Sequence, residues 1–147
     1  MTVAIGYDEA AYDLKQTLRA FVTSKGCEGE AFGAFSKEPA PYPDIAPTVA
    51  TAIAPGRFER EALLGGTGIG VAVTANKSKG IRAAERHDRY FAKRARTSDE
   101  AHILSMGARV VTPELPKLNQ QTSGTCEFEG GRSAVKVARI KAYEDAA

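Results

Sequence analysis

Short apolar runs alternate with amphipathic segments along this chain, and three of the runs end at a glycine. These three runs lie at residues 2–5, 61–64 and 102–106. After the first run, apolar residues repeat at the spacing of one helix face, at Leu14, Leu18, Phe21 and Val22. Strands that alternate with helices pair in parallel and carry the helices on both faces of the sheet. We therefore predict an α/β fold with a parallel sheet between two helical layers.

Weaker signals place the remaining elements. Two further strands, at residues 27–34 and 81–85, would complete a five-stranded sheet. Residues 36–47 contain four prolines and are predicted to form a loop, followed by a helix from Pro47 to residue 54. Further helices are expected at residues 71–76, 88–96 and 131–145. Pro113 is expected to begin a short helix that frays into a polar loop over residues 119–125.

Composition excludes several classes of protein. The 147 residues are enough for one domain, over residues 1–147, with its own core. A net charge of +2 without a basic run argues against nucleic acid, and no apolar stretch approaches the roughly 20 residues of a membrane span. Cys27 and Cys126 form no CxxC pair and no signal peptide is evident, so we expect reduced thiols in the cytoplasm. With two histidines and no cluster of ligands, we predict no metal.

A glycine-rich stretch lies between a predicted strand and a predicted helix. Residues 64–77 read Leu-Gly-Gly-Thr-Gly-Ile-Gly-Val-Ala-Val-Thr-Ala-Asn-Lys. A strand-to-helix turn presents backbone N–H groups and the positive end of a helix dipole, and glycines let a ligand approach closely. The stretch lacks the Gly-Lys-Ser/Thr ending of a P-loop and the spacing of a dinucleotide fingerprint. We interpret residues 65–70 as a cradle for an oxyanion; the alternative is a tight turn whose glycines serve packing only.

Four charged residues are candidates for a ligand-binding site. Asp8 ends the first strand and Arg109 follows the fifth, at the edge of the sheet where ligands bind in folds of this type. Arg132 and Lys136 are spaced i, i+4 and would project from one face of the last helix. Cations that converge on one point suit a phosphate. The alternatives are a helix cap for Asp8 and a solvated basic face for the last pair.

The sequence resembles the sugar-phosphate isomerase family typified by ribose-5-phosphate isomerase B, with the galactose-6-phosphate isomerase subunits as relatives. The likeness covers nearly the whole chain in order and lies in residues 4–10, 42–44, 66–70, 75–77, 80–83, 107–111 and 127–132. It implies a Rossmann-like α/β/α fold, a homodimer or homotetramer with its site at the dimer interface, and no cofactor or metal. The implied reaction interconverts an aldose and a ketose phosphate, of the ribose 5-phosphate/ribulose 5-phosphate type, through a cis-enediolate.

The resemblance also implies roles for individual residues. Asp8 would contact the sugar, and Thr67 and Gly68 would border the anion hole. The phosphate would be bound by three cations, two of them on a C-terminal helix that packs on the second subunit: Arg109, Arg132 and Lys136. The other positions that match substrate-binding or catalytic residues of the family are Tyr42, Gly65, Gly66, Gly70, Ser98 and Asp99.

The chain departs from the family at the positions that carry the chemistry. One branch of the family has a cysteine base at the position of Gly65, and the other has a glutamate base at the position of Val71. Neither glycine nor valine accepts a proton. Three histidines of the family are also replaced, at the positions of Glu9, Ser98 and Ser133. An asparagine of the family is replaced by Asp99.

These departures allow two interpretations. In the first, the chain isomerises a sugar phosphate too short to cyclise, such as a tetrose phosphate, and Glu9 beside Asp8 is a candidate base. The alternative for Glu9 is a surface or capping carboxylate. In the second, the chain is a catalytically impaired sugar-phosphate-binding homologue or the non-catalytic subunit of a hetero-oligomeric isomerase. A nucleotide-binding module is disfavoured, because the acidic turn after the first strand would repel a pyrophosphate.

Overall fold

The computed structural model describes residues 2–33, 38–39, 41–53, 58 and 60–147. These residues form a five-stranded sheet in which every neighbouring pair of strands is parallel, in the order β2-β1-β3-β5-β4. The strands are β1 (Thr2–Tyr7), β2 (Glu28–Gly33), β3 (Arg60–Gly65), β4 (Ala83–Glu85) and β5 (Ile103–Gly107). The predicted Rossmann-like α/β fold with a five-stranded parallel sheet is therefore confirmed.

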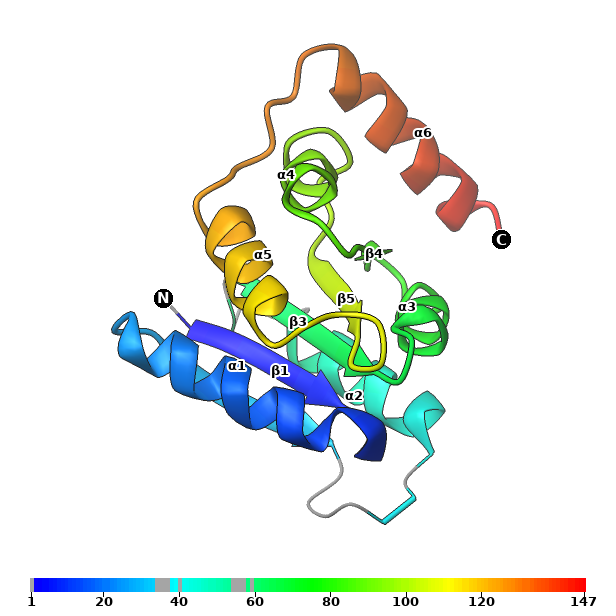
Figure 1. The fold of residues 1–147 in the computed structure, drawn as a ribbon. Helices are drawn as coiled ribbons and strands as arrows, with labels where there is room; N and C mark the ends of the chain where they lie inside the picture. Colours follow the sequence, from blue (N-terminus) through cyan, green and yellow to red (C-terminus); the bar gives the residue numbers. More distant parts are fainter. Residues whose placement is uncertain (1, 34–37, 40, 54–57, 59) are drawn as a thin grey trace.

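Helices cover both faces of this sheet (Figure 1). On one face α1 and α5 pack on the strands, and on the other face α2 and α3 do so. The helix α4 packs beside α5, and a short turn η1 (Glu9–Ala11) precedes α1. The helices are α1 (Tyr12–Ser24), α2 (Tyr42–Ile53), α3 (Ile69–Ala75), α4 (Arg89–Thr97), α5 (Glu114–Gly124) and α6 (Arg132–Asp145).

Alternating side chains of the strands build two cores. Val3 and Ile5 of β1 face the core that contains α1, whereas Ala4 between them faces the core that contains α2 and α3. Leu63 and Leu64 of β3 divide in the same way, and both are fully buried. Each such leucine contributes roughly 2 kcal/mol by burial. A slip by one residue would exchange the two faces, so this pattern sets the register that brings the ends of β1, β3 and β5 to one edge.

The helix predicted from Pro47 begins earlier, at Tyr42. The predicted loop over residues 36–47 is therefore wrong from Tyr42 onward, and residues 36, 37 and 40 lie outside the described residues, as does the predicted helix end at residue 54. Pro43 lies in the first turn, where its missing N–H has no intrahelical role, and Pro47 removes one hydrogen bond from the helix interior. The loss is offset by packing, since three side chains of α2 are buried against the sheet: Ala46, Val49 and Ala50.

The helix α5 also differs from its prediction. It was expected to fray into a polar loop over residues 119–125, yet the helix continues to Gly124. Asn119 and Gln120 are buried in spite of their polarity, and the Nδ2 atom of Asn119 lies 3.8 Å from the Sδ atom of Met106. Contact with the sheet therefore outweighs the weak intrinsic helix propensity of this polar segment.

Other boundaries move by small steps. The first strand extends to Tyr7, β4 begins at Ala83 rather than residue 81, and α3 begins at Ile69 rather than residue 71. The earlier start of α3 matters most, because it places Gly70 in the first helical turn. The glycine loop is thereby shortened to the residues between Gly65 and Ile69.

The helix α6 has little contact with the rest of the chain. Figure 1 shows it at the periphery of the molecule, after an extended segment. Among its described side chains α6 buries Val137 alone, whereas Val135 and Tyr143 are 74% and 68% exposed. Short helices depend on packing for most of their stability, and the described part of the chain does not cover these two side chains of α6.

Candidate active site

A cleft of about 220 Å³ opens at the carboxyl edge of the sheet. It lies where the glycine loop leaves β3, between the ends of β1 and β5. The residues that line it come from four segments and are Asp8, Tyr42, Gly65, Gly66, Thr67, Gly68, Gly70, Val71 and Arg109. All of them except Val71 are site residues predicted from the sequence, and a single chain brings them together.

Asp8 joins β1 to the glycine loop. Its Oδ1 atom accepts the N–H of Ala11 at 3.1 Å and thereby caps η1, and its Oδ2 atom accepts the N–H of Gly66 at 3.3 Å. Burial raises the pKa of this carboxyl above its ordinary value and the charge of Glu9 adds to the rise, while the N–H donors of Gly66 and Ala11 oppose it. Asp8 therefore acts as a helix cap, the alternative role given to it above, and its carboxyl also lines the cleft.

Ser105, which the sequence analysis did not single out, holds the glycine loop against β5. Ser105, in the middle of the buried β5, donates its hydroxyl proton to the carbonyl of Gly68. Gly68 has a φ of +87°, and a Cβ there would lie 2.8 Å from the carbonyl carbon of Met106. A Cβ on Gly107 would lie even closer to backbone, against the carbonyl oxygen of Thr67. A polar residue inside an apolar strand is the sequence signal that identifies Ser105.

The cation and the aromatic ring of the cleft come from opposite layers. The exposed Arg109 follows β5, and its N–H donates to the carbonyl of Gly66 at 3.0 Å. A Cβ on Gly66 would lie 3.6 Å from the guanidinium carbon of Arg109. Tyr42 begins α2, and its ring covers Gly70 so closely that a Cβ there would stand 2.7 Å from it. Glycines at these positions therefore leave the space that the two side chains occupy.

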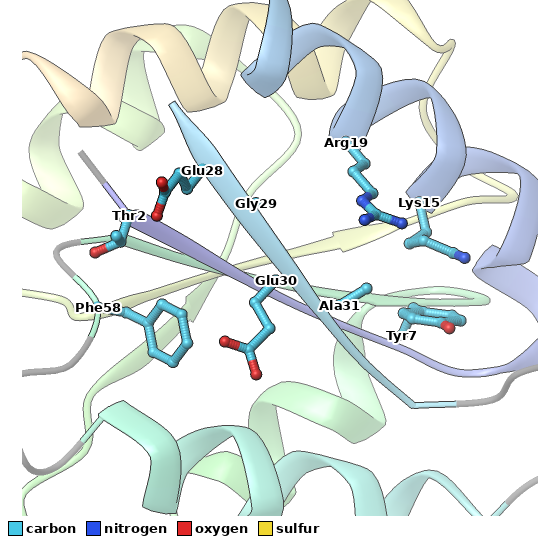
Figure 2. Close-up of a pocket in the computed structure, with 9 residues that line it drawn as sticks. All are labelled: Thr2, Tyr7, Lys15, Arg19, Glu28, Gly29, Glu30, Ala31 and Phe58. Atoms are coloured by element: carbon cyan, nitrogen blue, oxygen red, sulfur yellow. The ribbon is translucent and has the colours of Figure 1, made fainter. Parts of the chain in front are cut away.

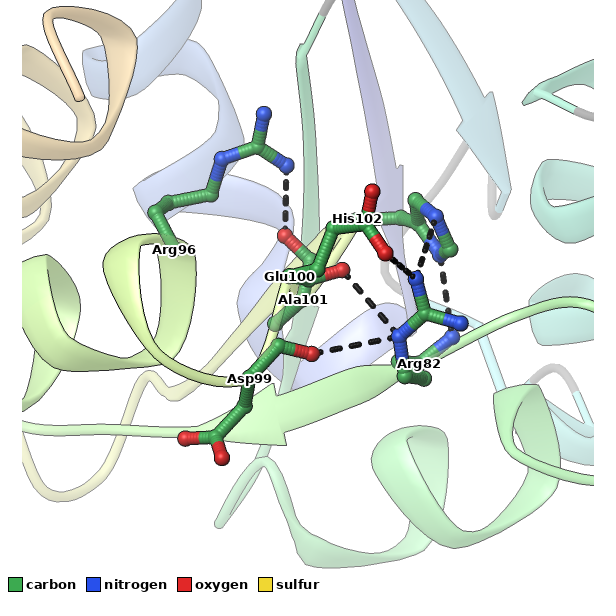
Figure 3. Close-up of polar contacts among 6 residues, drawn as sticks. All are labelled: Arg82, Arg96, Asp99, Glu100, Ala101 and His102. Atoms are coloured by element: carbon green, nitrogen blue, oxygen red, sulfur yellow. Dashed lines mark hydrogen bonds and ion pairs between the residues drawn. The ribbon is translucent and has the colours of Figure 1, made fainter. Parts of the chain in front are cut away.

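Ser98 and Asp99 lie outside this cleft. They follow α4 and precede β5, so within one chain they occupy the opposite edge of the sheet. Arg82 fixes this turn, because its Nε atom donates to the carbonyls of Asp99 (3.1 Å) and Glu100 (3.2 Å). Figure 3 shows the carboxylate of Asp99 directed away from this network. Arg82 thus holds the turn through its backbone carbonyls, and the carboxylate of Asp99 is exposed to solvent.

Arg132 and Lys136 also lie away from the cleft, on the exposed side of α6. The segment before α6 packs on the end of α4, where the N–H of Glu129 donates to the carbonyl of Thr97 at 3.1 Å. Thr97 is adjacent to Ser98, so the end of α4 and the start of α6 share one part of the surface. Ser98 and Asp99 therefore lie near the start of α6, which begins at Arg132, whereas Glu9, which is also absent from the cleft lining, lies in η1 beside Asp8.

A larger groove of about 610 Å³ surrounds the edge strand β2. Figure 2 shows Lys15 and Arg19 on the α1 side of β2, and Glu30 and Phe58 on the other side. The Nζ atom of Lys15 already lies 4.5 Å from the ring centre of Tyr7. This groove follows the outside of a strand, and its two cations, Lys15 and Arg19, share it with the carboxylates of Glu28 and Glu30. The smaller cleft is the better candidate.

Other features of the described residues bear on the remaining predictions. Their helices do not combine the length and apolar character needed to cross a membrane. Cys27 and Cys126 are half-buried free thiols, as expected. Within the described ranges no group of three or more His, Cys, Asp or Glu side chains offers a set of metal ligands.

Comparison with known proteins identifies the family. The model of the Ribose/Galactose Isomerase family matches residues 3–140. Ribose-5-P isomerase B of Listeria innocua is 48% identical over 137 residues, which cover 93% of each protein. D-erythrulose-4-phosphate isomerase of Pectobacterium atrosepticum is 46% identical over 146 residues, which cover 98% of this chain and 95% of that protein. Among solved structures, ribose-5-phosphate isomerase B of Clostridium thermocellum has a TM-score of 0.96 and 37% identity over 99% of each chain. The chain therefore belongs to the ribose/galactose isomerase family.

Proposed function

We propose that this protein is an aldose–ketose isomerase that acts on a small sugar phosphate. The observation that carries the proposal is the cleft, in which loop amides, the carboxylate of Asp8 and the guanidinium of Arg109 meet at the carboxyl edge of the sheet. Isomerisation through an enediolate needs donors for an oxyanion, and a phosphate needs a cation. Membership of the family, and relatives named as isomerases, support the same reaction class.

The glycine loop is suited to binding the enediolate oxygen. In α3 the N–H of Ala72 donates to the carbonyl of Gly68 at 3.2 Å, which closes the first helical turn. The N–H groups of Gly70 and Val71 precede that bond and lack a helical carbonyl four residues earlier. They therefore point positive ends of peptide dipoles toward the cleft, while Arg109 binds the phosphate.

We propose a tetrose phosphate as the preferred substrate. In a tetrose 4-phosphate the fourth oxygen carries the phosphate, so no five-membered ring forms and no residue is needed to open one. Ser98 stands where the family carries the histidine assigned to ring opening, and it lies outside the cleft. The relative from P. atrosepticum is named for D-erythrulose 4-phosphate. A pentose phosphate is the alternative, in line with the name of the relative from L. innocua.

The test is exchange of deuterium from the solvent. The protein is incubated in deuterated water with aldose and ketose phosphates of four, five and six carbons, and the products are followed by NMR. We expect deuterium at the carbon beside the carbonyl, with kcat/KM at least about tenfold higher for the four-carbon sugars, which corresponds to 1.4 kcal/mol. Binding without exchange, seen as a thermal shift, would favour the non-catalytic role that Gly65 and Val71 suggest. A protein that neither binds these sugar phosphates nor exchanges deuterium would contradict both roles.

We infer that the protein works as a homodimer in which α6 packs on the second copy. Four residues of α6 share one exposed face at i, i+4, i+7 and i+11, and they are Arg132, Lys136, Arg139 and Tyr143. Pairing through this face would cover Tyr143 and the adjacent Val135, which are both exposed, and would bring Arg132, Lys136 and Arg139 to the neighbour. The end of α4, with Ser98 and Asp99, lies beside the start of α6 and would arrive with it.

Two charges on this face should break the pairing. The double substitution Val135→Glu and Tyr143→Glu is expected to shift the protein toward the monomer and to lower exchange at least about tenfold, because a buried unpaired carboxylate is costly. Sedimentation equilibrium and the exchange assay on the same samples measure both effects. Thr23→Glu, at an exposed position of α1, is the matched control. A double variant that stays dimeric with full activity would contradict the inference.

We also propose a cytoplasmic location. Cys27 and Cys126 are free thiols. Free thiols persist in reducing compartments, whereas exported proteins commonly pair them.

A further inference from the structure

Isomerisation requires a group that removes a proton from carbon, and the cleft contains few such groups. Among the described residues that line it, the side chains with ionisable groups are Asp8, Tyr42 and Arg109. Phenols remain protonated and guanidinium groups remain charged near neutral pH, so neither accepts a proton readily. Given the proposed function, on which this assignment rests, we infer that the Asp8 carboxylate is the base that moves the proton between the two carbons.

The two oxygens of Asp8 have different surroundings. The Oδ1 atom accepts the N–H of Ala11 at 3.1 Å and serves as the cap of η1. The Oδ2 atom accepts the N–H of Gly66 at 3.3 Å and lies 3.1 Å from the point where a Cβ of residue 65 would stand. Because a carboxylate oxygen has two acceptor positions, Oδ2 keeps one of them for a substrate proton.

The absence of a side chain at Gly65 supports the assignment. A side chain there would begin 3.1 Å from Asp8 Oδ2 and 3.5 Å from the methyl groups of Val71. It would enter the space that Oδ2 now faces. A group at position 65 and the carboxylate of Asp8 therefore reach the same part of the cleft, and Asp8 is the group that this chain possesses.

The electrostatic surroundings of Asp8 fit a base. Burial raises the pKa of its carboxyl, and the charge of Glu9 raises it further. A base is most effective when its pKa approaches the working pH. The N–H donors of Gly66 and Ala11 hold the ionised form in place, and Arg109 and Tyr42 are the other ionisable groups that line the cleft with it.

The proposed proton transfer is balanced within the substrate. Asp8 Oδ2 takes the proton from the carbon beside the carbonyl, the electrons of that C–H bond form the C=C bond, and the carbonyl electrons move to the oxygen. The hydroxyl proton then passes between the two enediolate oxygens. Asp8 returns its proton to the former carbonyl carbon, and a carbonyl forms at the neighbouring carbon. Substrate and product are isomers, so no co-reactant is consumed.

Glu9, the base suggested by the sequence, is less well placed. It is the first residue of η1, is half-buried and is not among the described residues that line the cleft. Its contribution is the negative charge that raises the pKa of Asp8. Removing that charge should therefore shift the pH dependence of the reaction without removing the base.

The main test is Asp8→Asn in the full-length protein. This variant should lose about a thousandfold in the rate of deuterium exchange and change the substrate dissociation constant less than about tenfold. The asparagine oxygen still accepts the N–H of Ala11, so the cap is retained, whereas the amide Nδ2 atom cannot accept the N–H of Gly66. Asp13→Asn, at an exposed carboxylate of α1, is the matched control and should keep the wild-type rate. Glu9→Gln should keep exchange, with the acid limb of kcat/KM moved to lower pH.

A second variant separates chemistry from structure. Asp8→Ser also retains a cap but has no base, and added formate should restore part of its exchange. Exchange by Asp8→Asn at close to the wild-type rate, or loss of exchange in Glu9→Gln alone, would overturn the assignment and leave the isomerase function standing. No exchange by the wild-type protein with any sugar phosphate would overturn the function itself.

Discussion

Replacing Arg109 with methionine should raise the KM for the sugar phosphate by about tenfold to hundredfold, with a smaller change in kcat. Arg109 is the cation among the described residues that line the cleft. A hydrogen bond to a charged group contributes about 1.5–3 kcal/mol, which corresponds to this range of affinity. Its backbone N–H still donates to the carbonyl of Gly66 after the substitution, so the loop should keep its position. Steady-state kinetics measures KM, and inhibition by inorganic phosphate should weaken by a similar factor.

The control for this experiment tests the competing groove. Arg19→Met removes a cation that lines the groove around β2 (Figure 2). We expect no change in KM for Arg19→Met, because the carboxylates of Glu28 and Glu30 line the same groove and disfavour an anion there. If Arg19→Met raises KM and Arg109→Met leaves it unchanged, the phosphate binds beside β2 and the cleft is not the site.

The central strands can be predicted because burial dictates their composition. The predicted strand at residues 61–64 lies within β3, and the predicted strand at residues 102–106 overlaps β5 except for its first residue. Both β3 and β5 are buried on both faces. Central strands of parallel sheets read as nearly continuous apolar runs. The approach of Asp8 and Arg109 to the glycine loop follows from the same arrangement, because neighbouring parallel strands end at one edge. The layers and most of the cleft are therefore within reach of sequence analysis.

Elements whose stability comes from tertiary contact are harder to predict. The interior proline of α2, Pro47, argues against a helix locally, but burial of Val49 on the sheet outweighs that cost. In α5, Asn119 and Gln120 are residue types typical of loops, yet both are helical and buried. Local propensity and apolar periodicity carry no information about such contacts, so both helices were predicted too short.

The predicted site residues that lie outside the cleft show a different limit of sequence analysis. Arg132 and Lys136 form one face of α6 by their spacing alone. Periodicity identifies that face but does not say which molecule covers it. The second subunit was predicted from the resemblance to the family. The exposure of Val135 and Tyr143 is the structural observation that agrees with this prediction. The assembly of Ser98, Asp99 and these cations with the cleft stays a prediction.

The stability of the fold should decrease between about pH 5 and pH 8 through Glu61, and Glu61→Gln should remove most of this decrease. Glu61 lies near the start of β3 and is only 3% exposed. Burial raises its pKa from 4.5 to about 8, although the charges of Arg96 and Arg60 oppose the rise. The folded state therefore holds this proton more tightly than the unfolded state. The stabilisation is complete below pH 4.5 and is lost as the pH rises through about 8.

A rise in pKa from 4.5 to about 8 corresponds to a decrease in the free energy of unfolding on the order of 5 kcal/mol over this pH range. Glutamine has the size of a protonated glutamate and carries no charge. In urea unfolding, the Glu61→Gln variant should therefore have a free energy of unfolding that exceeds the wild-type value by more at about pH 9 than at about pH 5. Asp8 and His102 titrate in both proteins and cancel in the difference, and Glu28→Gln, at an exposed carboxyl of β2, is the control. If the wild-type protein instead gains stability over the variant at high pH, Glu61 is ionised in the fold. Attraction to Arg96 and Arg60 would then exceed the cost of burying its charge.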